Sequence, residues 1–374
     1  MVVYIRCGGA NMSDRNKIEG LFARFIFTPS QFLIGSLLLI TLSSPPAFAC
    51  SRLLWNSTDN QVIVGRTMDW AFPFENNLYI TPRGATINGG TKINPLSWTV
   101  KYGSVTSSIS NWLVKQGPFT LDDGAADGIN EKGFAAHFLF LSGSRYEKRD
   151  PSIPAVSTSR WVRYLLDNFA TVEEALAGMD HIQIVHAQIG DHPLDFHVAI
   201  EDKSGDSAII EFVNGKQVIH HGRNYTVMTN NPPYDEQIKE LKQYKPFGGQ
   251  KILPGDIESN QRFARLSYFS RYLPQTKKPE KAVAQVFSVM RTVISPIGAP
   301  YQNGAAYPTW WVSVSDLKNG VYHYDFIETP NTIHVNVKSI DFSKGSGIRW
   351  LNPRRLDISG LVNDQFKPIA PIAQ

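Results

Sequence analysis

The feature that most constrains this chain is the boundary in front of Cys50, one of its two cysteines. Residues 32–42 (FLIGSLLLITL) form an apolar run of about 11 residues, whereas a membrane-spanning helix needs about 20. Basic residues precede the run, residues 43–46 (SSPP) interrupt it, and the small-x-small triplet Ala47-Phe48-Ala49 ends directly at Cys50. This layout predicts that residues 1–49 are a secretory signal peptide cleaved after Ala49, rather than an uncleaved membrane anchor.

Cleavage at this boundary would discard Cys7 and leave Cys50 as the first residue and only thiol of the mature protein. Exported proteins usually pair their cysteines in disulfides, so a single one is either a reactive thiol or an intermolecular partner. Residues 50–374 show no repeat, linker or low-complexity segment, and we expect one domain. The sequence leaves open whether Met1 or Met12 is the start. The net charge of +4 and the lack of a basic stripe argue against a nucleic-acid partner.

An N-terminal cysteine has three interpretations. It can be the lipid-attachment site of an anchored binding protein, but lipoprotein processing favours an aliphatic residue three positions before the cysteine and a small one two before. Ala47 and Phe48 stand there instead. It can be inert. It can also be catalytic, because a thiol nucleophile and an α-amine with a pKa of about 7.7–8.0 then sit on one residue, and the amine can act as the base.

A β-hairpin is predicted directly after Cys50. Two apolar, β-branched stretches, residues 51–56 (SRLLWN) and 61–70 (QVIVGRTMDW), flank a polar turn. A hairpin returns the chain to its start, so we expect Arg66 and Asp69 beside Cys50. Arg66 would hold the thiol anionic, and Asp69 would accept a hydrogen bond from the protonated amine. The alternative is a surface Arg–Asp pair of little energetic value.

Four motifs in chain order resemble the choloylglycine hydrolase family, which contains penicillin V acylases and conjugated bile salt hydrolases. The first is C-x15-R-x2-D, starting at Cys50. The others are residues 127–134 (DGINEKGF), 227–237 (VMTNNPPYDEQ) and 253–265 (LPGDIESNQRFAR). The resemblance implies an α+β fold, the four-layer αββα sandwich of N-terminal nucleophile hydrolases. It also implies an amidase that needs no metal or organic cofactor.

The resemblance implies a catalytic set of five residues: Cys50, Arg66, Asp69, Asn230 and Arg262. In this set Cys50 is the nucleophile, and Asn230 supplies a side-chain donor to the oxyanion hole. Arg262 belongs to the charge network, and Asn231 and Arg265 are the rival assignments. We prefer Arg262 to Arg265 because the arginine of the family stands directly before Phe, as Arg262 stands before Phe263.

The substrate pocket is expected to be aromatic. Trp70, Phe138 and Phe140 are the predicted substrate contacts, and Phe72, Phe74 and Trp112 are further aromatic candidates. For each, ordinary core packing is the alternative. Bile salt hydrolases resembling this chain carry asparagine where it has Phe140, whereas penicillin V acylases carry an aromatic residue there. In those acylases the second oxyanion donor is a backbone N–H, here expected near Phe140.

The exported start, Phe140 and the short stretch between Asn230 and Arg262 resemble the Gram-negative branch of the family. That branch includes penicillin V acylases and acylases of N-acyl homoserine lactones. We therefore expect a secreted, periplasmic amidase without stable membrane insertion after cleavage, acting on a small amide with an aromatic or fatty acyl group. Conjugated bile salt hydrolysis is the alternative within the family. Family analogy also suggests a homotetramer.

Helices are predicted over residues 159–179 and 281–293, where apolar residues recur every three or four positions. Thr171 with Glu174 is typical of a capping box that opens a second helix within the first range. Strands are predicted at residues 196–202, 207–213 and 321–327, and a hairpin turn at 87–94. The histidines at positions 181, 186, 192 and 197 have the spacing of neither common zinc motif, so no metal site is predicted.

Overall fold

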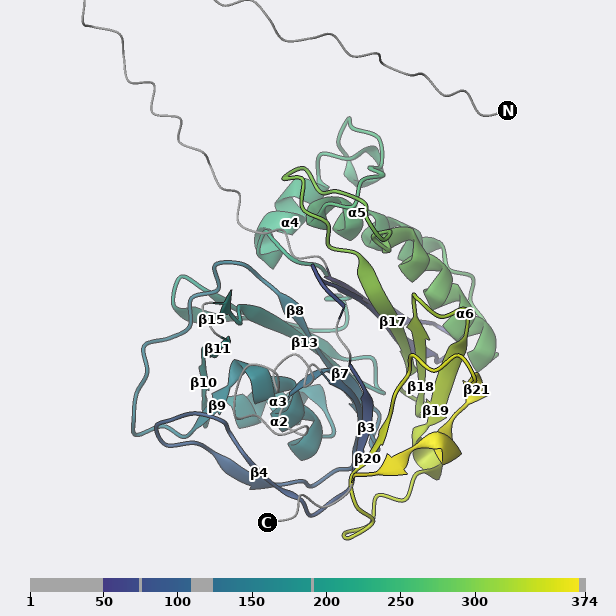
Figure 1. Cartoon of the computed structure of the whole chain (residues 1–374). Coiled ribbons are helices and arrows are strands. Elements are labelled where there is room, and N and C mark those ends of the chain that lie inside the picture. Colours follow the sequence, from purple (N-terminus) through teal and green to yellow (C-terminus); the bar gives the residue numbers. More distant parts are fainter. Residues whose placement is uncertain (1–49, 74–75, 109–123, 190–191, 370–374) are drawn as a thin grey trace, which may run out of the picture. The chain divides into compact units, whose positions relative to one another are not determined.

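Two large β-sheets form the centre of the computed structural model of this protein, which describes residues 50–73, 76–108, 124–189 and 192–369 (Figure 1). The predicted signal peptide (1–49) and the pocket candidates Phe74 and Trp112 lie outside the described residues. Within the described ranges, no helix is long and apolar enough to cross a membrane.

The first sheet has seven strands in the order β16-β1-β2-β17-β18-β19-β21. Their bounds are Val227–Met228, Cys50–Asn56, Val62–Asp69, Thr309–Asp316, Val321–Phe326, Thr332–Asn336 and Gly360–Leu361. All neighbours are antiparallel except β19 and β21. Strands β1 and β2 form the predicted hairpin, with Cys50 opposite Met68.

The second sheet has nine strands in the order β15-β14-β13-β8-β7-β6-β3-β20-β22. Their bounds are Lys216–His221, Ser207–Val213, Phe196–Asp202, Phe134–Phe140, Ala125–Asn130, Ser104–Ser108, Leu78–Thr81, Arg349–Leu351 and Lys367–Pro368. Three short pairs lie outside both sheets: β4 (Thr86–Asn88) with β5 (Ser97–Thr99), β9 (Ala155–Ser157) with β10 (Gln183–Val185), and β11 (Gln188–Ile189) with β12 (His192–Pro193). The β4–β5 pair contains the hairpin turn predicted at residues 87–94.

Helices cover the outer face of each sheet. Helices α2 (Trp161–Asn168) and α3 (Val172–Met179) pack on β7, β8 and β13, and α5 (Ser259–Phe269) and α6 (Pro279–Met290) pack on β1, β2 and β17. Helix α4 (Tyr234–Leu241) packs against α5. The two sheets face each other between these helix layers (Figure 1). The α+β, four-layer αββα prediction is confirmed.

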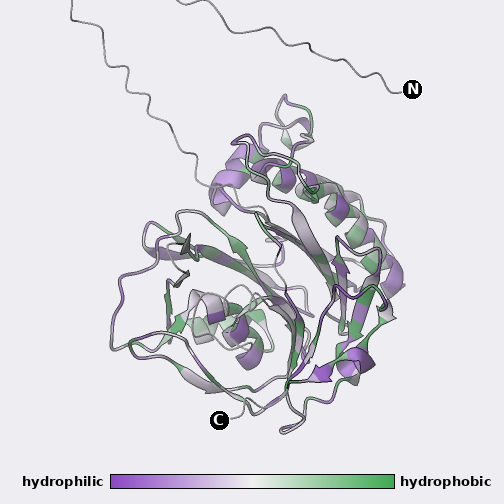
Figure 2. Ribbon diagram, in the orientation of Figure 1, coloured by the Kyte–Doolittle hydropathy of each residue, from purple (hydrophilic) through white to green (hydrophobic). Residues whose placement is uncertain are grey.

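Central strands are buried on both faces because each lies between the opposite sheet and a helix layer. Every residue of β2, β8 and β13 is buried, which explains why their sequences lack the apolar–polar alternation of a half-exposed strand. Hydrophilic and hydrophobic residues instead alternate along the covering helices (Figure 2). Gly65 of β2 lets α6 approach closely, since a Cβ there would lie 2.6 Å from Met290 Cγ.

The helix predictions are confirmed with shifted ends. The range 159–179 contains α2 and α3, and Thr171 Oγ1 accepts from the Glu174 amide as a cap of α3. The carboxylate of Glu174 reaches back to the amide of Ala170 rather than to that of Thr171, so the box is displaced by one residue. Helix α6 begins two residues before the predicted range, and its last turn continues as a 3-10 turn to Val293.

Candidate active site

Cys50 is the first residue of β1 and is 2% exposed. Its Sγ lies 3.8 Å from the carbonyl oxygen of Asp69, 3.9 Å from Met68 Sδ and 4.0 Å from Nη2 of Arg66. The hairpin register produces this grouping: Arg52 faces Arg66 across the ladder, and Cys50 lies two residues from Arg52, so all three project from the same side of the sheet. The structure thus brings Cys50, Arg66 and Asp69 together in the interior, not at the surface.

Arg66 is fully buried between the two sheets. Its Nη2 donates to the carbonyl of Phe138 on the opposite sheet at 2.9 Å, and its guanidinium lies 4.4 Å from the ring centroid of Trp311. The carbonyl of Phe138 is accessible because the β7–β8 ladder stops at the pair Asp127 and His137, while β8 continues to Phe140. The end of β8 is therefore paired with β13 on one side only, and its carbonyls at Phe138 and Phe140 accept hydrogen bonds from Arg66 and Asn230.

Asn230 joins three parts of the site. It follows the two-residue edge strand β16, and its Oδ1 accepts from the backbone nitrogen of Cys50 at 2.5 Å and from Nη2 of Arg262 at 3.0 Å. Its Nδ2 donates to the carbonyl of Phe140 at 2.7 Å. An amide nitrogen carries two hydrogens, and among the described residues only this acceptor is matched to Nδ2. Asn231 instead exchanges hydrogen bonds with the backbone of Ser142.

Arg262 is the arginine that reaches Cys50. It lies on α5, fully buried, and its Nη1 donates to the carbonyl of Cys50 at 2.6 Å and to the hydroxyl of Ser51 at 2.5 Å. Arg265, one turn later, donates instead to backbone carbonyls that include that of Asp256 at 2.6 Å. The arrangement favours Arg262 over Arg265 as the site residue.

Burial dominates the electrostatics of the site. It raises the pKa of Asp69 to about 7, against the opposing charges of Arg262 and Arg66 and the hydroxyls of Thr309 and Thr67. Burial likewise raises the pKa of the Cys50 thiol, and the positive charge of Arg66 only reduces this shift. The expectation that Arg66 holds the thiol anionic is therefore wrong for the uncleaved chain, since the desolvation of the sulfur outweighs the attraction. A base is needed to take its proton.

The backbone nitrogen of Cys50 donates to Asn230, not to the Asp69 carboxylate, while it is part of the peptide bond to Ala49. The predicted contact between Asp69 and a free α-amine concerns the cleaved chain and stays a prediction.

The three predicted substrate contacts form one aromatic group beside the site. Trp70 and Phe140 meet edge to face with ring centroids 5.9 Å apart, and Phe138 stacks on Phe196 at 3.9 Å. Phe72 meets Trp70 at 6.1 Å. Trp70, Phe138 and Phe140 are each at least nine-tenths buried, so packing accounts for most of their surface.

Sequence reasoning missed a chain of charged groups buried between the sheets. Arg52 of β1 binds Glu201, His137 lies between Glu201 and Asp127, and Tyr322 donates to Asp127 at 2.5 Å. Burial lowers the pKa of His137, but the two carboxylates outweigh it and raise this pKa to about 9. Strands β1 and β8 are buried on both faces, and their sequences show no alternation that would indicate which side chains meet between the sheets.

Gln237 was also missed, although it ends the stretch that carries Asn230. Its amide donates to the carbonyls of Asn230 at 2.6 Å and Pro232 at 2.7 Å.

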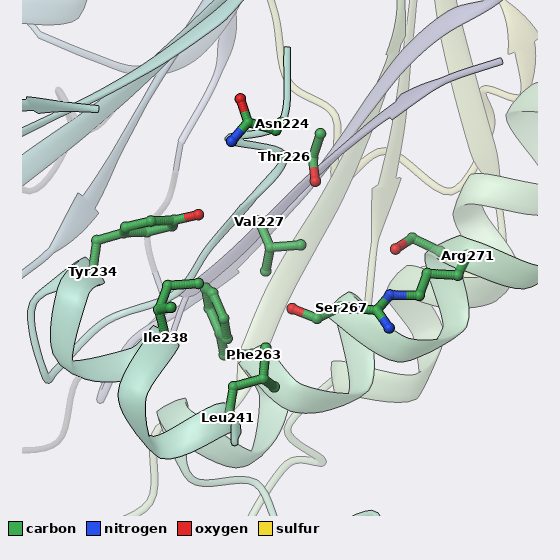
Figure 3. A pocket seen from close by; sticks show the side chains of 10 residues that line it. Asn224, Thr226, Val227, Tyr234, Ile238, Leu241, Phe263, Ser267 and Arg271 are labelled. Carbon is green, nitrogen blue, oxygen red and sulfur yellow. The ribbon is translucent and has the colours of Figure 1, made fainter. Parts of the chain in front are cut away.

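A cavity of about 260 Å³ lies away from this site (Figure 3). It is lined by Tyr234, Ile238 and Leu241 of α4, by Phe263 of α5 and by Val227 of β16, among others. None of the predicted site residues lines it.

Histidines 186 and 197 bind different carboxylates, those of Asp195 and Glu211. Within the described ranges, no group of three or more His, Cys, Asp or Glu residues is arranged to hold a metal ion.

Comparison with known proteins places this geometry in a family. The model for linear amide C–N hydrolases of the choloylglycine hydrolase family matches residues 50–348, so the match begins at Cys50. A penicillin V acylase of Pectobacterium atrosepticum is 36% identical over 362 residues, covering 90% of this chain and 94% of the relative. A bile salt hydrolase/transferase of Clostridium perfringens is 26% identical over 327 residues, covering 78% of this chain and 94% of the relative.

Solved structures agree with these sequence relationships. The penicillin V acylase from Agrobacterium tumefaciens superposes with a TM-score of 0.76 at 37% identity, covering 86% of this chain and 98% of that one. A mutant conjugated bile acid hydrolase from Clostridium perfringens shares the fold, with a TM-score of 0.69 at 22% identity over 83% of this chain and 98% of that one. The chain belongs to the choloylglycine hydrolase family of linear amide C–N hydrolases.

Proposed function

We propose that this protein is an exported N-terminal cysteine amidase that hydrolyses a non-peptide C–N amide bond of an N-acylated small molecule. The observation that supports it most is the surroundings of Cys50. Its sulfur lies between Arg66 and the Asp69 backbone, and its nitrogen is bound by Asn230, whose amide reaches the carbonyl of Phe140 at the end of β8. The family match that begins at Cys50 fits a mature chain that starts there.

The proposed reaction begins when cleavage after Ala49 converts the peptide nitrogen of Cys50 into an α-amine. Burial raises the thiol pKa, so the thiol needs a base. The α-amine, with a pKa of about 7.7–8.0, is largely unprotonated just above neutral pH and lies on the same residue, so it takes the thiol proton as the thiol attacks. The thiolate attacks the amide carbon and forms a C–S bond. The second hydrogen of Asn230 Nδ2 and a backbone N–H near Phe140 stabilise the oxyanion, a contribution of about 10²–10³ in rate per donor.

The tetrahedral intermediate then breaks its C–N bond, and the α-ammonium gives its proton to the departing amine. A thioester on Cys50 remains. Water, activated by the same α-amine, adds to the thioester carbon, and the C–S bond breaks to release the acid and restore the thiol. The chain's own groups thus supply the nucleophile, the base and the oxyanion donors, while Arg66 and Arg262 hold them in place.

The proposed substrate carries an aromatic or fatty acyl group, as in penicillin V or an acyl homoserine lactone. Support comes from the aromatic group of Trp70, Phe138 and Phe140 beside the nucleophile. It also comes from relatives named penicillin V acylase at 36% and 37% identity, against 26% or less for those named bile salt hydrolase/transferase. Conjugated bile salt hydrolysis is the second candidate. We further propose periplasmic location and a homotetramer by analogy.

Two measurements test this proposal. Mass spectrometry of the exported protein is expected to show an unmodified cysteine at the N-terminus, whereas a diacylglyceryl adduct would support a lipid-anchored binding protein instead. A substrate panel of penicillin V, acyl homoserine lactones and glycocholate then identifies the acyl preference. Cys50→Ala is expected to abolish turnover with the fold intact, and full activity of Cys50→Ser would contradict the nucleophile assignment.

A further inference from the structure

Gln237 forms a three-bond clamp around Asn230. It lies on α4, is 2% exposed, and its Nε2 donates to the carbonyl of Asn230 at 2.6 Å and to that of Pro232 at 2.7 Å. Its Oε1 accepts from the hydroxyl of Thr229 at 2.7 Å. The side chain of Gln237 therefore binds Thr229, Asn230 and Pro232. Both hydrogens and the oxygen of the Gln237 side-chain amide are used in these bonds.

The helix that carries Gln237 is itself anchored. Pro233 precedes α4 without offering a side-chain cap, and the carboxylate of Glu211, on β14 of the nine-stranded sheet, accepts from the Tyr234 amide at 3.1 Å. Nδ1 of His197 on β13 donates to the same carboxylate at 2.9 Å. The first turn of α4 is thereby fixed to the nine-stranded sheet.

Tyr234, Ile238 and Leu241 line the cavity between α4 and α5 (Figure 3). Gln237 shares this face of α4 by its helical spacing and reaches the carbonyls of Asn230 and Pro232. Asn230 itself needs support, because it follows an edge strand of only two residues. A loop residue that must aim an N–H at a developing charge requires a rigid support, since a misplacement of about 1 Å can cost about 100-fold in rate.

We propose that Gln237 is a positioning residue, which fixes the backbone at Asn230 so that the Asn230 amide is aimed between Cys50 and Phe140. The inference rests on the proposed amidase function and deepens it. Gln237 contacts neither the nucleophile nor substrate in this proposal. It acts through Asn230. Its loss therefore raises the free energy of the transition state and leaves the reactivity of the thiol unchanged.

Kinetics of Gln237→Glu and Gln237→Met test the clamp. The first keeps the size of the side chain but replaces the donor by an oxygen that faces two carbonyls, and the second removes all polar atoms. Each is expected to lower kcat/KM for the preferred amide about 10-fold to 100-fold, mainly in kcat. Gln243→Glu is the matched control, because Gln243 lies beyond the end of α4 and accepts from Lys251. It is expected to retain activity within about 3-fold.

A double-mutant cycle separates positioning from general damage. In an Asn230→Ala background the effect of Gln237→Glu is expected to shrink below about 3-fold, because the two residues act through one donor. Alkylation of Cys50 by iodoacetamide needs no oxyanion donor, so its rate is expected to stay within about 3-fold of wild type in the Gln237 variants. Equal losses in both backgrounds, or alkylation slowed in parallel with turnover, would overturn the proposal.

Hydrogen exchange gives a result that does not depend on activity. Peptides covering residues 227–233 are expected to exchange faster in Gln237→Glu and Gln237→Met but not in Gln243→Glu. Unchanged exchange in both variants would reject the clamp even if the wild-type protein hydrolysed none of the substrates. An inactive wild type with faster exchange in the variants would reject the proposed function and leave the clamp supported.

Discussion

Replacing Asp69 by asparagine is expected to stabilise the protein at pH 8 while removing its activity. Asp69 is fully buried, and burial raises its pKa to about 7 despite the charges of Arg262 and Arg66. A carboxyl group in an unfolded chain titrates near pH 3.9. Between these two values the folded protein holds a proton that the unfolded chain has released, so the free energy of unfolding falls as pH rises.

The size of this effect follows from the difference between the two pKa values. About 3 pKa units, at about 1.4 kcal/mol each, correspond to a loss of about 4 kcal/mol. The stability associated with neutral Asp69 is fully present below pH 4 and is lost as pH rises through about 7. An amide side chain at position 69 cannot ionise, so the Asp69→Asn variant is expected to avoid this loss while lacking the carboxylate that we propose orients the α-amine.

Urea unfolding at pH 4, 6 and 8, followed by tryptophan fluorescence, measures the effect. The variant is expected to match wild type at pH 4 and to exceed it by about 4 kcal/mol at pH 8. Asp59→Asn, in the turn of the same hairpin, is the control and is expected to show no such trend. In the cleaved protein a protonated α-amine near Asp69 lowers its pKa, so the difference is expected to be smaller than in the uncleaved chain.

Two outcomes would refute this reasoning: equal stability of Asp69→Asn and wild type at pH 8, or a difference that does not shrink toward pH 4. Equal stability at pH 8 would mean that the Asp69 carboxylate ionises in the folded protein without loss of stability, because its favourable contacts outweigh the free-energy cost of burial.

Four further predictions concern Arg262, His137 and Trp70. Arg262→Lys is expected to lower kcat/KM at least 10-fold, because an ammonium cannot bind Cys50, Ser51 and Asn230 together, whereas Arg265→Lys is expected to stay within about 3-fold in the same assay. His137→Gln, measured by urea unfolding at pH 7, is expected to lose about 3–5 kcal/mol, because it removes the cation between two buried carboxylates and leaves Glu201 with Arg52 as its cationic partner and Asp127 without its paired cation. Wild-type stability, in turn, is expected to fall as pH rises from about 6.5 through about 9, the raised pKa of His137. Trp70→Leu is expected to raise KM for aromatic acyl substrates about 10-fold with a smaller change in kcat.

The sequence predicted the groups that local structure brings together. Cys50, Arg66 and Asp69 are joined by one hairpin, and strand periodicity with a polar turn was enough to place them. Asn230 and Arg262 lie far along the chain and were placed only by the family resemblance. Asn230 lies near Cys50 because the edge strand β16 pairs with β1, and Arg262 does because α5 packs on β1. No local sequence pattern indicates either contact.

What could not be predicted depends on contacts between the sheets. The net shift of the Cys50 pKa reverses the expectation drawn from Arg66, since the cost of desolvation depends on how completely the nine-stranded sheet covers the sulfur. The stacking of Phe138 on Phe196 and the charged chain around His137 likewise require the register of β8 against β13. Gln237 lay within a recognised motif, but its role appears only once α4 is seen beside the Asn230 loop.

Chain ends usually fray, yet Cys50 begins a strand that pairs with β2 along its whole length and with β16 in its middle. A mature N-terminus at Cys50 would be buried in the core and held as rigidly as the strands around it. In the proposed cleaved form, an affinity tag or a retained initiator methionine at that end would keep the nitrogen of Cys50 in an amide bond. Recombinant versions of this protein are therefore best tagged at the opposite terminus and produced with a leader that the host removes completely.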